Sequence, residues 1–263
     1  MTDAVLLVDH EGNSARYFEA LNPKILRSTD EVQSAFDTHS RRALWIVPKS
    51  SGMKPLSTLR GGRRGDHRLL CLGHIEGVRR EILHAHFRFV VAPADGVKLL
   101  PIDEMAEVLA APHREDLFIG GAVDTIDRAL VLYRGSLEPL VVPLAWFARS
   151  GGPRPDPEDF EVADFGQTIR LGEFEAAADA ILYEFDPEAR RRSKKRAIAE
   201  DQSFGGALRR LRKERGVRRE DFEGVSAKEI ARLERGEVDK PHADTLHKIA
   251  KTLGVSADEL ETY

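Results

Sequence analysis

Residues 203–260 read SFGGALRRLRKERGVRREDFEGVSAKEIARLERGEVDKPHADTLHKIAKTLGVSADEL, a stretch in which helix-stop residues separate short amphipathic segments. A first helix is predicted from Ser203, which suits an N-cap, to Gly216, which suits the position after a C-cap. Leu208 and Leu211 are three residues apart and fall on one face of this helix. The stretch therefore predicts a small bundle of short helices.

A second helix is predicted over residues 227–235, between a tight turn that ends in the N-cap residue Ser226 and the stop at Gly236. Ile230 and Leu233 are three residues apart and would point into the bundle. Two helices joined by a turn that contains Gly form a helix-turn-helix, whose second helix enters the DNA major groove. The side chains left facing outward are those that a groove would contact, namely Ala227, Lys228, Ala231 and Arg232.

The segments GVSAKEIARLERGE and KPHADTLHKIAKTLGVSADEL resemble the Cro/phage-repressor (XRE) helix-turn-helix family, whose fold is a lambda-repressor-like helical bundle. The resemblance covers roughly a fifth to a quarter of the chain. It implies that Ala227, Lys228 and Arg232 read bases, because Ala can contact a thymine methyl and the two cations can donate to guanine. It also implies contacts with the DNA backbone from Arg218, Arg219, Ser226, Lys240 and His242.

The chain departs from this family between Phe222 and Gly224, where it is about three residues shorter than the family norm. The helix that precedes the turn should therefore have only about one and a half turns. We expect the scaffold that supports the recognition helix to differ from the family at this point.

A basic segment, PEARRRSKKR, precedes the bundle, and we interpret residues 188–202 as a basic linker. Its cations would neutralise DNA phosphates and add affinity that depends on salt but not on sequence. They are Arg190, Arg191, Arg192, Lys194, Lys195 and Arg196. The alternative is the basic end of a solvated helix.

The net charge of −4 alone argues against DNA as a partner. The distribution of the charges favours it, because basic residues gather before and within the predicted helix-turn-helix. Residues 190–235 contain sixteen Lys and Arg against eight Asp and Glu. Hydrophobic residues make up 41% of the chain and charged residues 32%, which predicts a soluble globular protein of two or three domains. We expect no signal peptide and no membrane segment. The single cysteine, Cys71, excludes an internal disulfide and fits a reducing bacterial cytoplasm.

Residues 1–111 alternate short apolar runs with helical stretches, which predicts a doubly wound α/β domain with a parallel sheet. The apolar runs are AVLLVD (4–9), KILRST (24–29), RALWIV (42–47), RLLCLG (68–73) and RFVVAP (88–93). The helical stretches are residues 13–21, 30–39, 53–60, 77–87 and 101–111.

This pattern resembles the response-regulator receiver domain, and another flavodoxin-like domain is the alternative. A receiver requires an acid pair that binds Mg²⁺, an Asp that accepts the phosphoryl group and a Lys that neutralises it. In this chain the acid-pair positions are Asp9 and His10, and the acceptor position is Val47 or Pro48. The Lys position is Ala92, and Gly73 stands where receivers usually have Thr or Ser in the fourth strand. The resemblance therefore implies a receiver fold without phosphorylation. We interpret residues 9–11 (Asp-His-Glu) as a solvated loop rather than a metal site.

Residues 112–187 predict a small α+β domain. Strand-like segments cover residues 117–123, 128–135 and 140–147, a hairpin or strand pair covers 160–174, and an Ala-rich helix begins at 175. The PLAWF and DFGQTIRLGEF texts resemble a small bacterial domain of unknown function that often precedes a Cro-type module. We expect Trp146 and Phe147 to be core residues, with a dimer contact as the alternative.

These features predict a cytoplasmic bacterial transcriptional regulator that binds double-stranded DNA in a sequence-specific way as a homodimer on a pseudo-palindromic operator. Residues 203–263 would bind DNA, and the upstream domains would set the oligomeric state or receive a protein or small-molecule signal at the N-terminal domain. The alternative is a protein-interaction scaffold with weak, non-specific DNA tethering. We expect no catalytic residues, metal or cofactor, because no catalytic constellation is visible.

Overall fold

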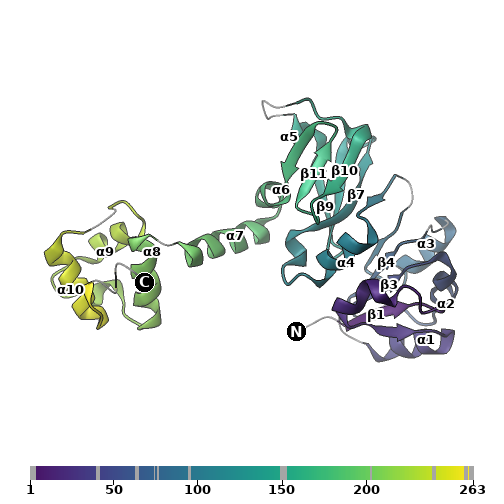
Figure 1. Ribbon diagram of the computed structural model, residues 1–263, viewed down its shortest axis with the longest axis horizontal. Coiled ribbons are helices and arrows are strands. Elements are labelled where there is room, and N and C mark those ends of the chain that lie inside the picture. Colours follow the sequence, from purple (N-terminus) through teal and green to yellow (C-terminus); the bar gives the residue numbers. More distant parts are fainter. Residues whose placement is uncertain are drawn as a thin grey trace. The chain divides into compact units, whose positions relative to one another are not determined.

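The computed structural model describes residues 4–39, 42–62, 65–73, 75, 77–93, 96–148, 153–201, 203–238, 241–257 and 260. The chain divides into two compact units, Met1–Pro187 and Glu188–Tyr263, and the elements of both are drawn in Figure 1. None of the helices within the described ranges is long and apolar enough to cross a membrane.

The first unit contains a five-stranded parallel sheet with the strand order β2-β1-β3-β4-β5. Its strands are β1 (Ala4–Val8), β2 (Lys24–Leu26), β3 (Ala43–Val47), β4 (His67–Cys71) and β5 (Phe89–Val91). Every residue of β3 and β4 is buried, because strands of a sheet covered on both faces have no solvent side. The order is one of the two common orders of doubly wound sheets, and the expected parallel α/β sheet is present.

Two groups of helices pack with this sheet. In one group α1 (Thr29–Thr38) contacts α2 (Met53–Ser57), which in turn contacts α3 (Gly77–His84). In the other, the 3-10 helix η1 (Ala15–Leu21) contacts α4 (Ile102–Ala110). The segment predicted as a helix over residues 13–21 is therefore a 3-10 helix, interrupted by non-helical backbone at Phe18, whose side chain is fully buried.

An aromatic cluster fills the core beneath α1. Trp45 packs at an angle against Phe36 and Phe87, and its indole Nε1–H donates to Nδ1 of His67 at 2.9 Å. Burial lowers the pKa of His67, so the ring is neutral and its Nδ1 is available as an acceptor. The buried indole N–H thus has a partner inside the core.

Two antiparallel sheets form the remainder of the first unit. The strands β6 (Lys98–Leu99), β7 (Phe118–Asp124), β8 (Ala129–Arg134) and β9 (Pro139–Pro143) lie in sequence order in one sheet, and β10 (Phe160–Ala163), β11 (Thr168–Leu171) and β12 (Phe174–Ala177) in the other. The short helices are η2 (Ser50–Gly52), η3 (Arg114–Asp116), α5 (Leu144–Phe147), η4 (Pro157–Asp159) and α6 (Ala178–Phe185). Although β6 lies within residues 1–111, it pairs with β7, which belongs to residues 112–187.

Two predictions of local structure in this region were wrong. Residues 175–177 are not the start of the Ala-rich helix but belong to the strand Phe174–Ala177, whose side chains are alternately buried and exposed and which pairs with β11. Leu144–Phe147 is a turn of helix and not the end of a strand. Phe147 is 1% exposed, as expected for a core residue, while Trp146 is half-buried and contacts Phe147 and Phe185 edge to face.

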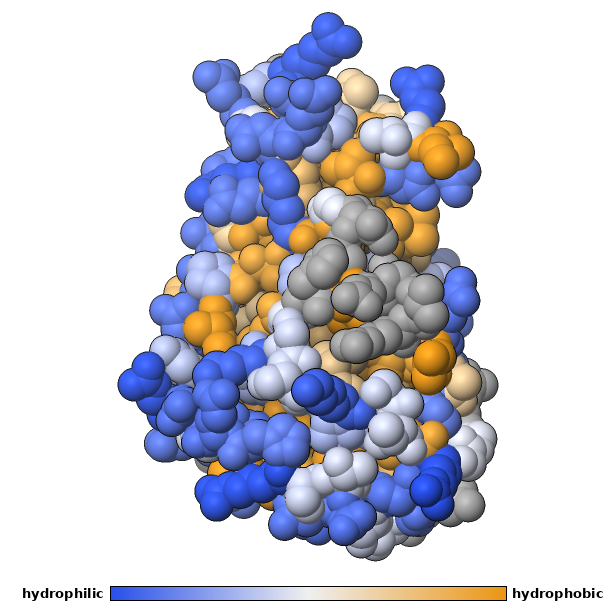
Figure 2. Space-filling view, turned by 90° about the vertical axis from the view of Figure 1, so that its right-hand side faces the viewer, coloured by the Kyte–Doolittle hydropathy of each residue, from blue (hydrophilic) through white to orange (hydrophobic). Residues whose placement is uncertain are grey.

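Hydrophilic residues make up much of the face drawn in Figure 2, and hydrophobic residues are exposed between them. One exposed apolar side chain in the described part of the chain is Val141, at 58%, on the edge strand β9. It lies between Pro139 and Pro143, which have no N–H to donate to an added strand. Prolines on an edge strand oppose pairing with another chain, so this edge is poorly suited to strand addition.

A buried arginine joins the parallel sheet to the antiparallel one. The side chain of Arg68 on β4 is 4% exposed and contacts Asp66 and Glu138, each at 2.8 Å. It also donates to the carbonyl oxygen of Ser136 in the turn between β8 and β9. Because a buried charge is tolerated only when it is paired, this turn and β4 depend on one another.

We expect the Arg68→Met variant to lower the unfolding free energy of the first unit by about 3 to 5 kcal/mol, since the buried ion pairs lose one partner. Tryptophan fluorescence in a denaturant titration measures this, because both tryptophans, Trp45 and Trp146, lie in the first unit. Arg88→Met is the control, because Arg88 is half-exposed and lies 3.8 Å from Asp66, and it should cost less than about 1 kcal/mol. Equal losses in the two variants would contradict the assigned role of Arg68.

The second unit contains the helix α7 (Pro187–Glu200) and a bundle of short helices around one core. The bundle consists of α8 (Phe204–Glu214), the 3-10 turn η5 (Arg219–Asp221), α9 (Ala227–Glu234) and α10 (Ala243–Leu253). The segment interpreted as a basic linker is thus largely helical, in α7. The core is formed by Leu208, Leu211, Phe222, Val225, Ile230, Leu233, Leu246, Ile249, Ala250, Leu253 and Leu260.

Candidate nucleic-acid interface

Close packing of α8 against the end of α9 positions the recognition helix. Ser203 caps α8 by accepting a hydrogen bond from the backbone N–H of Gly206 at 3.1 Å. A Cβ atom at Gly205 would overlap the backbone carbonyl oxygen of Leu233, so only glycine allows this approach. Gly205, near the start of α8, is therefore required for the close packing of the two helices.

The turn η5 replaces the short helix expected before the recognition helix. Arg219–Asp221 form a single 3-10 turn, and the Asp221 carboxylate accepts a hydrogen bond from the backbone N–H of Arg218 at 2.7 Å. Phe222 follows directly and is 3% exposed in the core. Because few residues separate Val217 from Phe222, the chain uses the tighter 3-10 geometry to bring Phe222 inward. The element is shorter than the one and a half turns that we expected.

A buried carboxylate connects the three elements around the recognition helix. Glu234, at the end of α9, has a fully buried side chain that contacts Arg212 of α8 and Arg219 of η5, each at 2.5 Å. Its backbone oxygen accepts a further hydrogen bond from Arg209 of α8. These contacts join α8, η5 and α9 through one residue. Sequence reasoning missed this role, although Glu234 follows Ile230 by four residues and therefore shares its inward face.

The arginines also determine the charge of Glu234. Burial raises the pKa of its carboxyl group, but hydrogen bonds from Arg212 and Arg219, together with their charges, outweigh burial and hold the pKa below its ordinary value. The carboxylate is therefore charged at neutral pH. A lowered folded-state pKa contributes stability above the ordinary carboxyl pKa, and this contribution is lost as the pH falls through the folded-state value.

The outward face of α9 carries the residues expected to read bases. Lys228 and Arg232 are exposed, Ala227 and Ala231 are half-buried, and Ile230 is fully buried on the opposite side. The observed helix begins at Ala227, as expected, after Ser226, whose hydroxyl accepts from the backbone N–H of Glu229 at 3.1 Å. The side chains expected to read bases are thus on one side of the helix.

An exposed acid lies beside this face. Glu237 contacts Arg232 at 3.2 Å and Arg235 at 2.6 Å. Hydrogen bonds from Arg235 and Arg232 lower the pKa of Glu237, so it is charged at neutral pH. Exposed ion pairs contribute only about 0 to 1 kcal/mol, so Arg232 can exchange Glu237 for another acceptor at little cost.

The residues expected at the DNA backbone differ in what they contact. The side chain of Arg218 is 81% exposed and lies 3.7 Å from Asp221, whereas Arg219 is 41% exposed and is paired with the buried Glu234. His242 is exposed at the start of α10, and Ser226 serves as the N-cap of α9. Lys240 lies outside the described residues.

The basic residues of α7 lie on several sides of that helix. Arg190 and Arg192 are half-buried, and the exposed cations are Arg191, Lys194, Lys195 and Arg196. Ala189 is 6% exposed, and the apolar residues Ala197, Ile198 and Ala199 follow the cations in the helix. Four of the six cations are thus exposed, while Arg190 and Arg192 are partly covered.

A second candidate site, the carboxyl end of the parallel sheet, is filled by close packing. A Cβ at Gly52 would lie 2.9 Å from Val47 and 3.0 Å from the carbonyl oxygen of Val8, so η2 is packed onto the ends of β1 and β3. A Cβ at Gly73 would lie 2.6 Å from Ser50. Ligands of open α/β sheets bind in the crevice at this end, and here a turn of the chain occupies part of it.

The loop at residues 9–11 is only partly solvated, which corrects the interpretation from sequence. Asp9 is 4% exposed and accepts a hydrogen bond from the backbone N–H of Ser14 at 2.8 Å, at the start of η1. His10 and Glu11 are more exposed, and Glu11 pairs with Lys49 at 2.6 Å. Asp9 therefore has a structural partner. Within the described ranges, no group of three or more His, Cys, Asp or Glu residues is placed to hold a metal ion.

We expect Glu234→Gln to lower the unfolding free energy of the second unit by about 3 to 5 kcal/mol at neutral pH, because two arginines lose a buried partner. The difference from the unchanged protein should shrink as the pH falls below 4.5, the ordinary carboxyl pKa. Hydrogen exchange at the amides of α8, α9 and α10 measures this, since the tryptophans report only on the first unit.

The matched control is Glu220→Gln, which removes the same charge from an exposed residue of η5. It should leave amide protection nearly unchanged. If Glu234→Gln is as stable as this control at neutral pH, the buried cluster does not stabilise the bundle.

Comparison with known families supports this geometry. Residues 203–262 match a family model described as a helix-turn-helix domain. No curated protein and no solved structure matches the chain. The matched range begins at the N-cap of α8 and contains η5, α9 and α10. The C-terminal part of this chain is therefore a helix-turn-helix domain, which indicates DNA binding.

Proposed function

We propose that the protein is a transcriptional regulator that binds double-stranded DNA at a specific operator, with a helix-turn-helix of the Cro/phage-repressor (XRE) type. The observation that carries this proposal is the outward face of α9, where Lys228 and Arg232 are exposed and one helical turn apart. Lys and Arg donate to guanine O6 and N7, and the half-buried Ala227 allows close approach to a thymine methyl. These three residues are assigned to base reading.

Contacts with the phosphates would position the helix in the groove. We assign them to Arg218, Arg219, Ser226 and His242. Lys240, which lies outside the described residues, is assigned to the phosphates from the family resemblance alone. The cations of α7 would add affinity that falls with salt, because neutralised phosphates release counterions. Their number in one fourteen-residue helix supports this assignment.

A homodimer on a pseudo-palindromic operator follows from the small size of one module. A single helix-turn-helix buries too little DNA surface for strong discrimination, and two copies related by a two-fold axis read two half-sites one helical turn or a multiple of it apart. We place the protein in the bacterial cytoplasm, where it would reach the chromosome.

The first unit has a non-catalytic role in this proposal. We assign to it oligomerisation and reception of a signal, with a receiver-like fold in residues 1–111 that is not phosphorylated. The packing of Gly52 against Val8 and Val47 supports this, because it occupies space at the end of the sheet where receivers carry out their chemistry. Residues 112–187 resemble a domain of unknown function, so the resemblance implies no activity for them.

Changing both Lys228 and Arg232 to Ala should weaken operator binding at least about 30-fold, since each base contact contributes about 1 to 3 kcal/mol. Footprinting on the promoter region of the protein's own gene identifies the site, and a gel shift at constant salt measures the affinity. The control replaces Lys213 and Lys251, which are exposed on α8 and α10.

The control removes the same charge without touching α9, so it should reduce the affinity for all DNA similarly and leave the preference for the operator intact. Unchanged specific binding by the α9 variant would overturn the proposed recognition helix. Equal affinity for all sequences, with one common dependence on salt, would favour the scaffold with non-specific tethering.

Glu237→Gln should strengthen operator binding by about two- to fivefold, because Arg232 loses a competing partner and the DNA loses a nearby negative charge. The measurement is the same gel shift. Glu229→Gln serves as the comparison, since Glu229 is exposed on α9 but forms no ion pair with Arg232. A gain of equal size in both variants would attribute the effect to net charge alone and contradict the release of Arg232.

A further inference from the structure

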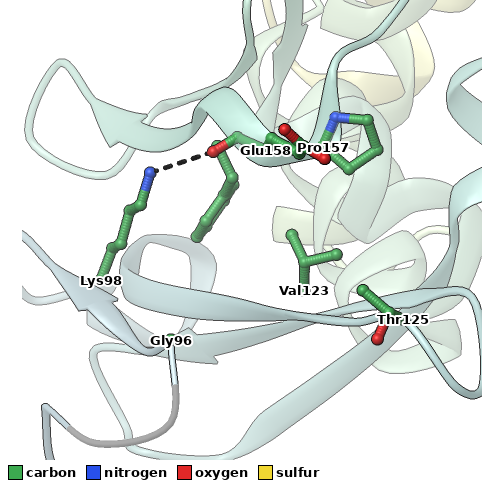
Figure 3. Close-up of a pocket in the computed structure, with 7 residues that line it drawn as sticks. Gly96, Lys98, Val123, Thr125, Pro157 and Glu158 are labelled. Carbon is green, nitrogen blue, oxygen red and sulfur yellow. Dashed lines mark hydrogen bonds between the residues drawn. The ribbon is translucent and has the colours of Figure 1, made fainter.

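A pocket of about 240 Å³ lies in the first unit and is lined by residues of that unit (Figure 3). It opens between the β6 and β7 strands on one side and the segment of η4 and β10 on the other. The residues that line it are Gly96, Lys98, Val123, Thr125, Pro157, Glu158 and Phe160. The pocket is therefore built from both antiparallel sheets, which pack together at this point.

The walls of this pocket are mainly apolar. Val123, Pro157 and Phe160 line it with hydrocarbon groups. Phe160 is itself 2% exposed, so it forms a firm inner wall. Pockets that bind small molecules have such walls with a few polar groups that determine orientation.

One cation lies at the rim. The Lys98 ammonium group donates to the backbone oxygen of Glu158 at 3.5 Å, a long hydrogen bond, as Figure 3 shows. This is its one hydrogen bond to the described residues, and an ammonium group has three donors. Lys98 therefore has donors available for a ligand at the edge of an apolar space.

We propose that this pocket binds a small organic acid, with an apolar body of about six carbons and one carboxylate. The body would contact Val123, Pro157 and Phe160, and the carboxylate would pair with Lys98. The size is sufficient, because a cavity of about 150 Å³ in another protein holds benzene. The site does not depend on the DNA-binding function, since every residue in it belongs to the first unit.

The carboxylate of Glu158 affects simple organic acids and amino acids differently. Its side chain is exposed and adds a negative charge beside the pocket. For a simple acid this charge is unfavourable, so Glu158→Gln should strengthen binding. For an amino acid, whose ammonium group could pair with Glu158, the same change should weaken binding. A gain in affinity in Glu158→Gln therefore supports the proposed simple acid, and a loss would indicate an amino acid.

Calorimetric titration of the full chain with benzoate tests the proposal. We expect saturable binding that is about fivefold weaker in Lys98→Ala, and about fivefold weaker for benzamide, which keeps the ring and loses the charge. Lys54→Ala is the control, because Lys54 is an exposed lysine of α2 outside the pocket. Equal weakening in the two lysine variants, or no saturable binding of benzoate or hexanoate, would overturn the proposal.

A second variant locates the ligand independently of charge. Val123→Phe fills the pocket with a residue that strands accept readily, and Val123 is only half-buried. It should abolish benzoate binding while circular dichroism and the melting temperature stay close to those of the unchanged protein. A folded Val123→Phe variant that still binds benzoate would place the ligand elsewhere, and stronger binding of phenylalanine than of benzoate would overturn the simple-acid assignment.

Discussion

The buried carboxylate of Glu234 is the interaction on which the DNA-binding part depends. Moving a carboxylate out of water is costly unless hydrogen bonds and opposite charges replace its hydration. Arg212 and Arg219 supply both, at 2.5 Å each, and they come from the elements before and after the first turn of the bundle. The recognition helix is thereby held at its C-terminal end, although the element that precedes it is a single 3-10 turn.

The parts of this site that the sequence predicts are those formed by residues close together in the chain. The ends of α9 follow from local chemistry, since Ser226 caps the helix and Gly236 adopts the left-handed conformation that stops it. The pairing of Glu234 with Arg219 is not local, because the two residues are fifteen apart and meet only when the bundle forms. Helical spacing from Ile230 could have placed Glu234 on the inward face, but it could not have revealed its partners.

The same distinction applies to the first unit. The parallel sheet was predictable, because β3 is a continuous apolar run and β4 ends in one, as expected for strands covered on both faces. The strand β12 was not, since its alanines favour a helix and only pairing with β11 makes it a strand. The pocket beside Lys98 was not predictable from the sequence, because its residues come from segments more than sixty positions apart that two packed sheets bring together.

Burial divides the arginines of the second unit between two tasks. Arg212 is 12% exposed and its acidic partner is fully buried, so moving Arg212 to a phosphate would leave the buried carboxylate with one arginine fewer. Arg232 and Glu237 are each nearly half-exposed, and water can replace either partner at small cost. Arginines of equal charge therefore differ in how easily they can leave their acidic partner for a DNA acceptor. In the proposed complex, DNA can recruit Arg232, which pairs with an exposed acid, while Arg212, which pairs with the buried Glu234, holds α9 in place.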